Sequence, residues 1–180
     1  KTMASPWAVS TKLVPAHPPV IHIPAGFRPP TGFSPPGPST YLPVGRLDLH
    51  AAMARTALTS LASHTLIQAQ MAAAAASVDY CIDDGSTGFE LSPDLQHLNG
   101  AERTALAGRI GAGLCDLYMI SLGYVWRDQA IRLVRTRKPL ADFVYEGPPT
   151  HGFGVAIAEA KGSTQRGTYS ATQKIVDSAY

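Results

Sequence analysis

Three residues near the C-terminal end of the chain have the types and the spacing that metal-assisted hydrolysis requires. Asp142 lies near the start of a predicted strand over 140–146, and Glu159 and Lys161 lie near the end of another over 153–161. Alternate residues of a strand share one face, so Glu159 and Lys161 point to the same side. If the two strands pair antiparallel through the loop between them, we expect two carboxylates and an ammonium group to converge at one end of the sheet.

This set of side chains is suited to the hydrolysis of phosphodiesters. Mg²⁺ or Mn²⁺ binds carboxylate oxygens together with several waters, so Asp142 and Glu159 are the predicted metal ligands, with the backbone carbonyl of Ala160 as a further one. A bound divalent metal lowers the pKa of a water and neutralises charge on the scissile phosphate. Lys161 would position the attacking water or stabilise the developing negative charge.

The order Ala141-Asp142, sixteen intervening residues and Glu159-Ala160-Lys161 resembles the PD-(D/E)XK motif of restriction-endonuclease-like nucleases. The resemblance covers residues 99–180 and implies an α/β core made of a helix, a β-meander and a second helix. It implies that Asp142 and Glu159 bind Mg²⁺ or Mn²⁺ and that Lys161 is the catalytic lysine. Ala141 stands where the motif usually has proline. Family members often add side chains from neighbouring helices, which would here be Glu102, Asp116 and Gln173.

Basic residues gather beside the predicted site, although the net charge of the chain is only +2. Contacts with phosphates depend on a local density of cations rather than on a high overall charge. We therefore expect DNA as a partner, while the alternative is that these residues form the solvated rim of a hairpin. The predicted DNA-contacting residues are Arg132, Arg135, Arg137, Lys138 and Arg166.

A helix predicted over 101–122 precedes these strands. Asn99 followed by Glu102 resembles a capping box, and Gly123 is typical of the position just after a helix. Glycine and alanine make the helix slim, so it is expected to lie close to the sheet. Glu102 and Asp116 share one face of the helix, which is expected to be solvated unless one of these carboxylates joins the metal site.

Residues 46–98 form a predicted helical region between the N-terminal segment and the nuclease-like core. The run Leu47–Val78 has no proline or glycine and is rich in alanine, leucine, methionine and glutamine, so it predicts one long helix. His50 and His64 are expected to be ordinary residues of its polar face rather than metal ligands. Ser92-Pro93 predicts the start of a short helix.

Most of the 15 prolines lie within residues 1–45. Proline fixes φ and lacks a backbone donor, so this segment is expected to be an extended arm, neither helical nor part of a central strand. Scattered apolar residues such as Ile23 and Phe27 indicate that the arm covers a surface, either of this chain or of a protein partner or second copy. The alternative is a semi-rigid linker to an upstream domain.

The remaining features restrict the class of protein. No stretch of about 18 apolar residues is present, so a membrane-spanning helix and a membrane partner are not expected. No secretion signal is visible, which indicates a cytoplasmic protein. Two cysteines exclude a disulfide scaffold, and the excess of arginine over lysine with abundant alanine indicates a bacterial genome. Because the chain starts at Lys1 and reaches Tyr180 where the second helix has barely begun, we expect a piece of a longer protein with a C-terminally incomplete core.

Functions of different classes fit these observations. The first is a metal-dependent endonuclease that cuts DNA, as a defence or effector enzyme. The second is a non-catalytic binding or assembly subunit that uses the arm and the long helix for protein contacts. A third is another small hydrolase in which Glu159 and Lys161 act as acid and base.

Overall fold

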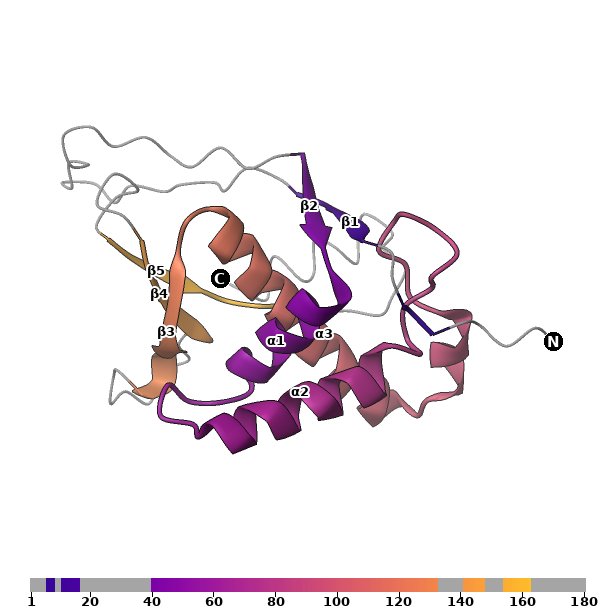
Figure 1. The fold of residues 1–180 in the computed structure, drawn as a ribbon, viewed down its shortest axis with the longest axis horizontal. Helices are drawn as coiled ribbons and strands as arrows, with labels where there is room; N and C mark the ends of the chain where they lie inside the picture. The colour runs from indigo at the N-terminus through magenta and orange to yellow at the C-terminus, as the bar shows by residue number, and fades with distance from the viewer. Residues whose placement is uncertain (1–5, 9–10, 17–39, 133–140, 148–153, 163–180) are drawn as a thin grey trace.

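The computed structural model describes residues 6–8, 11–16, 40–132, 141–147 and 154–162. In these residues three α-helices lie beside two small antiparallel sheets (Figure 1), which confirms the predicted mixed α/β class. The elements in chain order are β1 (Lys12–Pro15), β2 (Tyr41–Val44), α1 (Arg46–Thr56), α2 (His64–Val78), the 3₁₀ helix η1 (Pro93–His97), α3 (Gly100–Ser121), β3 (Val125–Gln129), the 3₁₀ turn η2 (Ala130–Arg132), β4 (Phe143–Glu146) and β5 (Val155–Ala158).

Helix α3 contacts α1, α2, β2 and β3, so it is the element around which the fold is assembled. The side chain of Asn99 accepts a hydrogen bond from the backbone N–H of Glu102 at 3.0 Å, which satisfies one of the free donors at the start of the helix. Gly123 follows its end with a φ of 86°, a conformation that favours glycine. The helix predicted over 101–122 is thus confirmed with its caps. Among the residues that the structure describes, no helix combines the length and the apolar character needed to cross a membrane.

The single long helix predicted over Leu47–Val78 is wrong. Two helices, α1 and α2, are joined there by residues 57–63. Ser63 permits the second start, because its side-chain oxygen accepts a hydrogen bond from the backbone N–H of Leu66 at 3.3 Å. Helix propensity alone favours either arrangement, and burial decides between them, since folding back lets both helices place apolar side chains in one core.

The main core lies where α1, α2 and α3 meet the N-terminal segment. Gly113 of α3 lets α1 come close, because a Cβ at this position would lie 2.7 Å from Cγ of Met53. Ala74 of α2 has no exposed surface and belongs to this core. The buried apolar residues of this core are Trp7, Leu42, Val44, Leu49, Met53, Ala74, Val78, Ile82, Leu95, Leu106 and Ile110.

Strands β3, β4 and β5 form an antiparallel meander in that order, as predicted from the sequence. In the β4–β5 ladder Phe143 pairs with Ala158, and Tyr145 pairs with Ala156. The alanines of β5 pack against a second apolar cluster that includes Tyr124 and partly buried residues of α3. The expectation that the slim helix lies close to the sheet is therefore confirmed.

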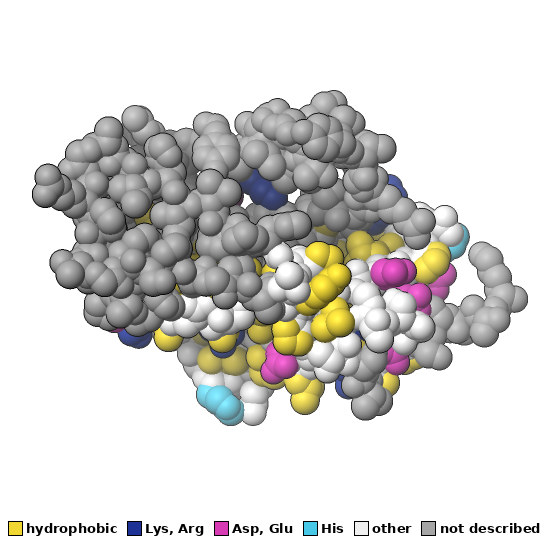
Figure 2. Space-filling view, turned by 90° about the horizontal axis from the view of Figure 1, so that it is seen from above, with side chains coloured by type: hydrophobic (Ala, Val, Ile, Leu, Met, Phe, Trp, Pro, Cys, Tyr) yellow, Lys and Arg dark blue, Asp and Glu magenta, His cyan; other side chains and the backbone are white. Residues whose placement is uncertain are grey.

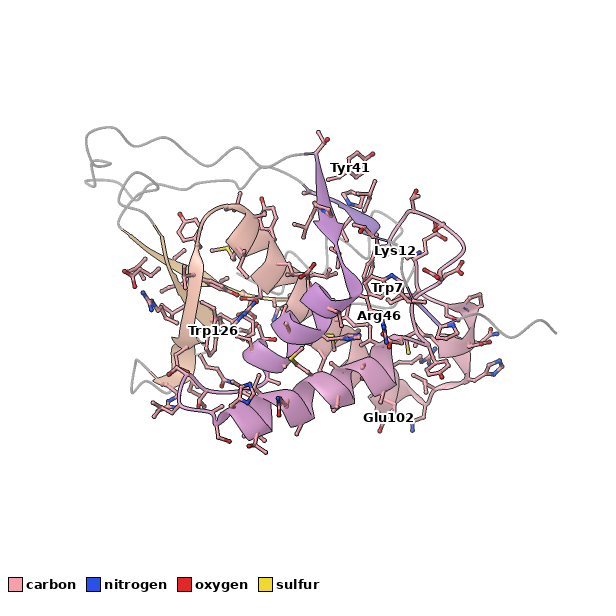
Figure 3. The ribbon with its side chains drawn as sticks, viewed as in Figure 1. Trp7, Lys12, Tyr41, Arg46, Glu102 and Trp126 are labelled. Carbon is pink, nitrogen blue, oxygen red and sulfur yellow. The ribbon has the colours of Figure 1, made fainter. Side chains whose placement is uncertain are left out.

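The N-terminal segment contributes to the main core in its described part. The backbone N–H of Trp7 donates a hydrogen bond to the carbonyl of Asp79 at 2.8 Å, and the Trp7 side chain is fully buried. β1 pairs antiparallel with β2, and both are edge strands, which is why the ladder tolerates Pro43. Figure 3 shows that Trp7 and Lys12 come from the segment that runs alongside the helices.

A buried acid, Asp79, joins the start of α1 to the end of α2. Arg46 Nη2 donates to its Oδ2 at 2.5 Å, and His50 Nε2 lies 2.8 Å from its Oδ1. His50 is only 2% exposed, so its expected place on a solvated polar face is wrong. His64 is exposed at the first turn of α2, as predicted.

Replacement of Trp7 tests whether the N-terminal segment is part of the folded unit. Trp7→Ala removes a fully buried indole and is expected to lower the free energy of unfolding by about 3–5 kcal/mol. Leu61→Ala is the control, because Leu61 is 80% exposed and its loss is expected to change stability by no more than about 0.5 kcal/mol. Urea denaturation followed by circular dichroism measures both values. Equal stability of the two variants would contradict the assignment of Trp7 to the core.

Candidate functional site

The β4–β5 register brings Asp142 and Glu159 to the same end of the sheet. Phe143 and Ala158 are the last pair of the ladder, so Asp142, just before β4, and Glu159, just after β5, lie at the same end of the sheet. The backbone N–H of Ala160 donates to Asp142 Oδ2 at 2.8 Å, and Lys161 Nζ lies 2.6 Å from Glu159 Oε1. The predicted antiparallel pairing is confirmed, and it gathers two carboxylates and one ammonium group.

Lys161 is held in its charged form. The hydrogen bond and the negative charge of Glu159 raise the pKa of Lys161, and the charge of Asp142 adds to this against a weaker effect of burial. The group therefore carries its proton at neutral pH. Lys161 can act there as a cation or as a proton donor, which leaves the base of an acid–base pair to one of the carboxylates.

The face of β5 that leads to Glu159 and Lys161 is open to solvent, and both residues follow the end of the strand at Ala158. On this face Val155 is 61% exposed and Ile157 is 67% exposed, whereas Ala158 on the opposite face packs towards α3. The acid and the lysine therefore follow an exposed strand face.

Two glycines fix the chain just after Lys161 against α3. A Cβ on Gly162 would lie 1.8 Å from the carbonyl oxygen of Ala107, and a Cβ on Gly111 would lie 2.9 Å from Cα of Gly162. The backbones can approach this closely only where both positions lack a side chain. This contact fixes where Glu159 and Lys161 lie relative to the helix.

An open cleft of about 360 Å³ adjoins the acid–lysine pair. Glu159 and Lys161 line it together with α3 residues such as Leu114 and Tyr118 and with N-terminal residues such as Leu42. The N-terminal segment was expected to cover a surface, but its place beside Glu159 and Lys161 could not be predicted. Leu42 and Glu159 are more than a hundred positions apart, and no local sequence pattern connects them.

Asp116 belongs to a buried polar network rather than to the carboxylate cluster. It has no exposed surface. Its Oδ2 accepts hydrogen bonds from Arg55 Nε at 2.9 Å and Nη2 at 2.5 Å, and its Oδ1 accepts one from the Tyr145 hydroxyl at 3.1 Å. The expected solvated face is wrong for Asp116, and its engaged oxygens leave the proposed accessory ligand role without support.

The neighbouring thiol of Cys115 is kept protonated. Burial, followed by the charges of Asp116 and Asp142, raises the pKa of Cys115 to about 11. Burial also raises the pKa of Cys81. Only the thiolate is an effective nucleophile, so the raised pKa of each thiol lowers its reactivity at neutral pH.

Glu102 and Arg132 are the two other predicted site residues that the structure describes, and they lie in different parts of the fold. Glu102 is exposed in the first turn of α3, about 14 Å along the helix axis from Gly111 at 1.5 Å per residue, and Figure 3 shows it far from the sheet. Arg132 is exposed in η2. The N–H of Ala130 in this turn donates to the carbonyl of Asp142 at 2.9 Å, so Arg132 lies at the same end of the sheet as the carboxylates.

On the face seen in Figure 2, the lysine and arginine side chains of the described residues occur singly among hydrophobic and acidic ones. Arg127 is paired with Glu146 on the neighbouring strand. A dense basic patch is therefore not a feature of the described part of this face. The remaining predicted site residues lie outside the described residues and are Arg135, Arg137, Lys138, Arg166 and Gln173.

Asp142 and Glu159 fit the donor chemistry of a divalent metal. One oxygen of each carboxylate is engaged, by Ala160 N–H and by Lys161 respectively, and each carboxylate has a second oxygen. Among the described residues, no group of three or more His, Cys, Asp or Glu side chains is placed to hold a metal ion. Mg²⁺ commonly takes only one or two carboxylates, with waters and substrate phosphates completing its shell, so a pair is a sufficient protein contribution.

Comparison of this chain with protein-family models, with curated proteins and with solved structures found no match. The restriction-endonuclease-like core and the PD-(D/E)XK family therefore stay predictions that rest on the motif.

Gly162 provides a test of the close contact between β5 and α3. Gly162→Ala places a methyl group on the carbonyl of Ala107 and is expected to lower the free energy of unfolding by about 1–3 kcal/mol. Gly108→Ala is the matched control, because nothing lies within 4 Å of a Cβ there, and alanine is expected to stabilise α3 by about 0.5–1 kcal/mol. Thermal unfolding of both variants measures the difference, and a Gly162→Ala protein as stable as wild type would show that this contact does not form.

The raised pKa of Cys115 predicts slow alkylation. In a Cys81→Ser background, iodoacetamide at pH 8 is expected to react about 100-fold more slowly with the folded protein than with the urea-unfolded protein, whose thiol has the ordinary pKa of 9.0. The rate in the folded state should rise about tenfold per pH unit up to about pH 10, because the thiolate fraction does. Mass spectrometry follows the reaction. Equal rates in the two states at pH 8 would show that Cys115 is an accessible, ordinary thiol.

Proposed function

We propose that this chain is a cytoplasmic, metal-dependent endonuclease of the PD-(D/E)XK type that hydrolyses phosphodiester bonds of DNA. One observation carries the proposal. The β4–β5 register brings Asp142 and Glu159 to one end of the sheet, and Lys161 Nζ lies 2.6 Å from Glu159 Oε1. The motif predicts this gathering of side chains, and it joins residues from two separate segments of the chain.

The side chains of this cluster have distinct roles in the proposal. Asp142 and Glu159 would hold Mg²⁺ or Mn²⁺, which when bound activates a water and offsets charge on the phosphate. The N–H of Ala160 fixes Asp142 Oδ2 and so orients that carboxylate. Lys161, kept protonated by its acidic neighbours, would donate to a phosphate oxygen as negative charge develops. Arg132, at the same end of the sheet, would contact the DNA backbone.

The exposed apolar residues of the sheet favour a second candidate function. Val125, Val155 and Ile157 are 55%, 61% and 67% exposed. Exposed apolar side chains that lie together mark surfaces for binding other molecules more often than sites of chemistry. A binding or assembly subunit that contacts a protein partner or a second copy through this sheet is therefore the alternative to the nuclease.

Loss of cleavage in single variants tests the nuclease. Asp142→Asn, Glu159→Gln and Lys161→Met are each expected to lower the rate of nicking of supercoiled plasmid in Mg²⁺ or Mn²⁺ by at least about 100-fold. Gel electrophoresis of the plasmid forms measures the rate, and a chelator is expected to abolish it.

Glu146→Gln is the matched control. Glu146 is an exposed acid at the end of β4 that is farther from Asp142. It pairs with Arg127 at the surface, so its replacement should leave the rate of DNA cleavage unchanged. If the wild-type protein cuts neither DNA nor RNA with any divalent metal, the binding subunit is the better account. Cleavage that survives in all three site variants would assign the activity to other residues.

A further inference from the structure

The cleft beside Glu159 and Lys161 is lined by residues from three parts of the chain that are far apart in sequence. Val14 comes from β1 and Leu42 from β2, Leu114 and Tyr118 come from α3, and the segment Glu159–Lys161 completes the lining. Its volume of about 360 Å³ lies at the lower end of the range for small-molecule sites. Its lining is apolar except at the segment that also carries the proposed catalytic acid and lysine. A ligand that fits is mostly apolar, with a charged or polar group at the end that reaches Glu159 and Lys161.

We propose that this cleft receives one unstacked nucleobase of a bound nucleic acid, whose attached phosphate lies at Asp142, Glu159 and Lys161. The inference rests on the proposed function. Glu159 and Lys161 belong to both the cleft and the carboxylate cluster. A base and its phosphate are joined through a single sugar, so a phosphate at the cluster places its own base within reach of the adjoining space.

The chemistry of the walls matches the two faces of a base. Aromatic rings offer a stacking surface to any of the four bases, and the ring of Tyr118 lines the cleft. Aliphatic side chains such as Leu114 and Leu42 can cover the other face. Because a base must leave its stack to enter, single-stranded or unpaired substrates are expected to bind better than a perfect duplex.

The experiment fills the cleft and measures binding to DNA. All proteins carry Asp142→Asn, so that the substrate stays intact in Mg²⁺. The probe is a single-stranded oligonucleotide of about a dozen nucleotides with a central 2-aminopurine, compared with its duplex form. Ala16→Phe fills the cleft from the end of β1 and Leu114→Phe fills it from α3. Thr11→Phe is the matched control, because it adds the same bulk to an exposed position next to β1.

The proposal predicts about a tenfold weaker affinity for the single strand in each filled variant, an unchanged affinity in Thr11→Phe, and a fluorescence change of 2-aminopurine that only the unfilled proteins produce. Two filling variants from opposite walls are used so that one that fails to fold, judged by thermal unfolding, leaves the other. Affinity and fluorescence equal to the parent in a folded filled variant would overturn the inference, and so would a parent that binds no single strand.

A DNA-cleavage assay with protein that retains Asp142 distinguishes a failure of this inference from a failure of the proposed function. If that protein cuts DNA while filled variants bind as the parent does, the nucleobase site is wrong and the nuclease stands. If it cuts nothing but the cleft variants lose affinity as predicted, the base-binding cleft stands and the nuclease is wrong.

Discussion

The buried charge of Asp116 is the constraint on which the arrangement of α1, α3 and the sheet depends. A carboxylate without exposed surface must be balanced inside the protein, because an isolated buried charge is very unfavourable. Arg55 provides the balance from α1, and Tyr145 provides a hydrogen bond from β4. The three residues come from three elements, so the network is complete only when helix, helix and strand have docked together. Removal of one member would leave the others uncompensated, whereas a surface pair would simply become hydrated.

Small residues determine how close the docked layers come. Gly113 admits Met53 of α1 on one side of α3, and Gly111 admits the backbone at Gly162 on another. Larger side chains at Gly111 and Gly113 would move the packed layers apart and break the hydrogen bond between Tyr145 and Asp116. The slim helix thus connects core packing with the site, because the chain that bears Glu159 and Lys161 passes directly over it. Stability and the placement of the carboxylates depend on the same contact.

Local patterns predicted those parts of the fold that local physics decides. The caps of α3 at Asn99 and Gly123, the meander and the alternation along β5 follow from residue type and spacing alone. The division of Leu47–Val78 does not, because both a long helix and two shorter ones satisfy propensity, and only burial in a shared core separates them. The burial of Asp116 and the role of His50 were missed for the same reason. Their partners, Arg55 and Asp79, are distant in sequence, and a charged residue carries no local mark of a distant counter-charge.

The cluster of Asp142, Glu159 and Lys161 at the end of β4 and β5 contributes little to the stability of the fold. Its presence is therefore better explained by a role in binding. Exposed ion pairs such as Glu159 with Lys161 contribute between about zero and 1 kcal/mol. Like charges close together on neighbouring strands repel each other, and Asp142 and Glu159 lie at the same end of β4 and β5. Lys161 balances one of these two negative charges. Neither carboxylate belongs to the buried core. A divalent cation held between them, with an anionic substrate to complete its shell, would turn this local repulsion into binding energy.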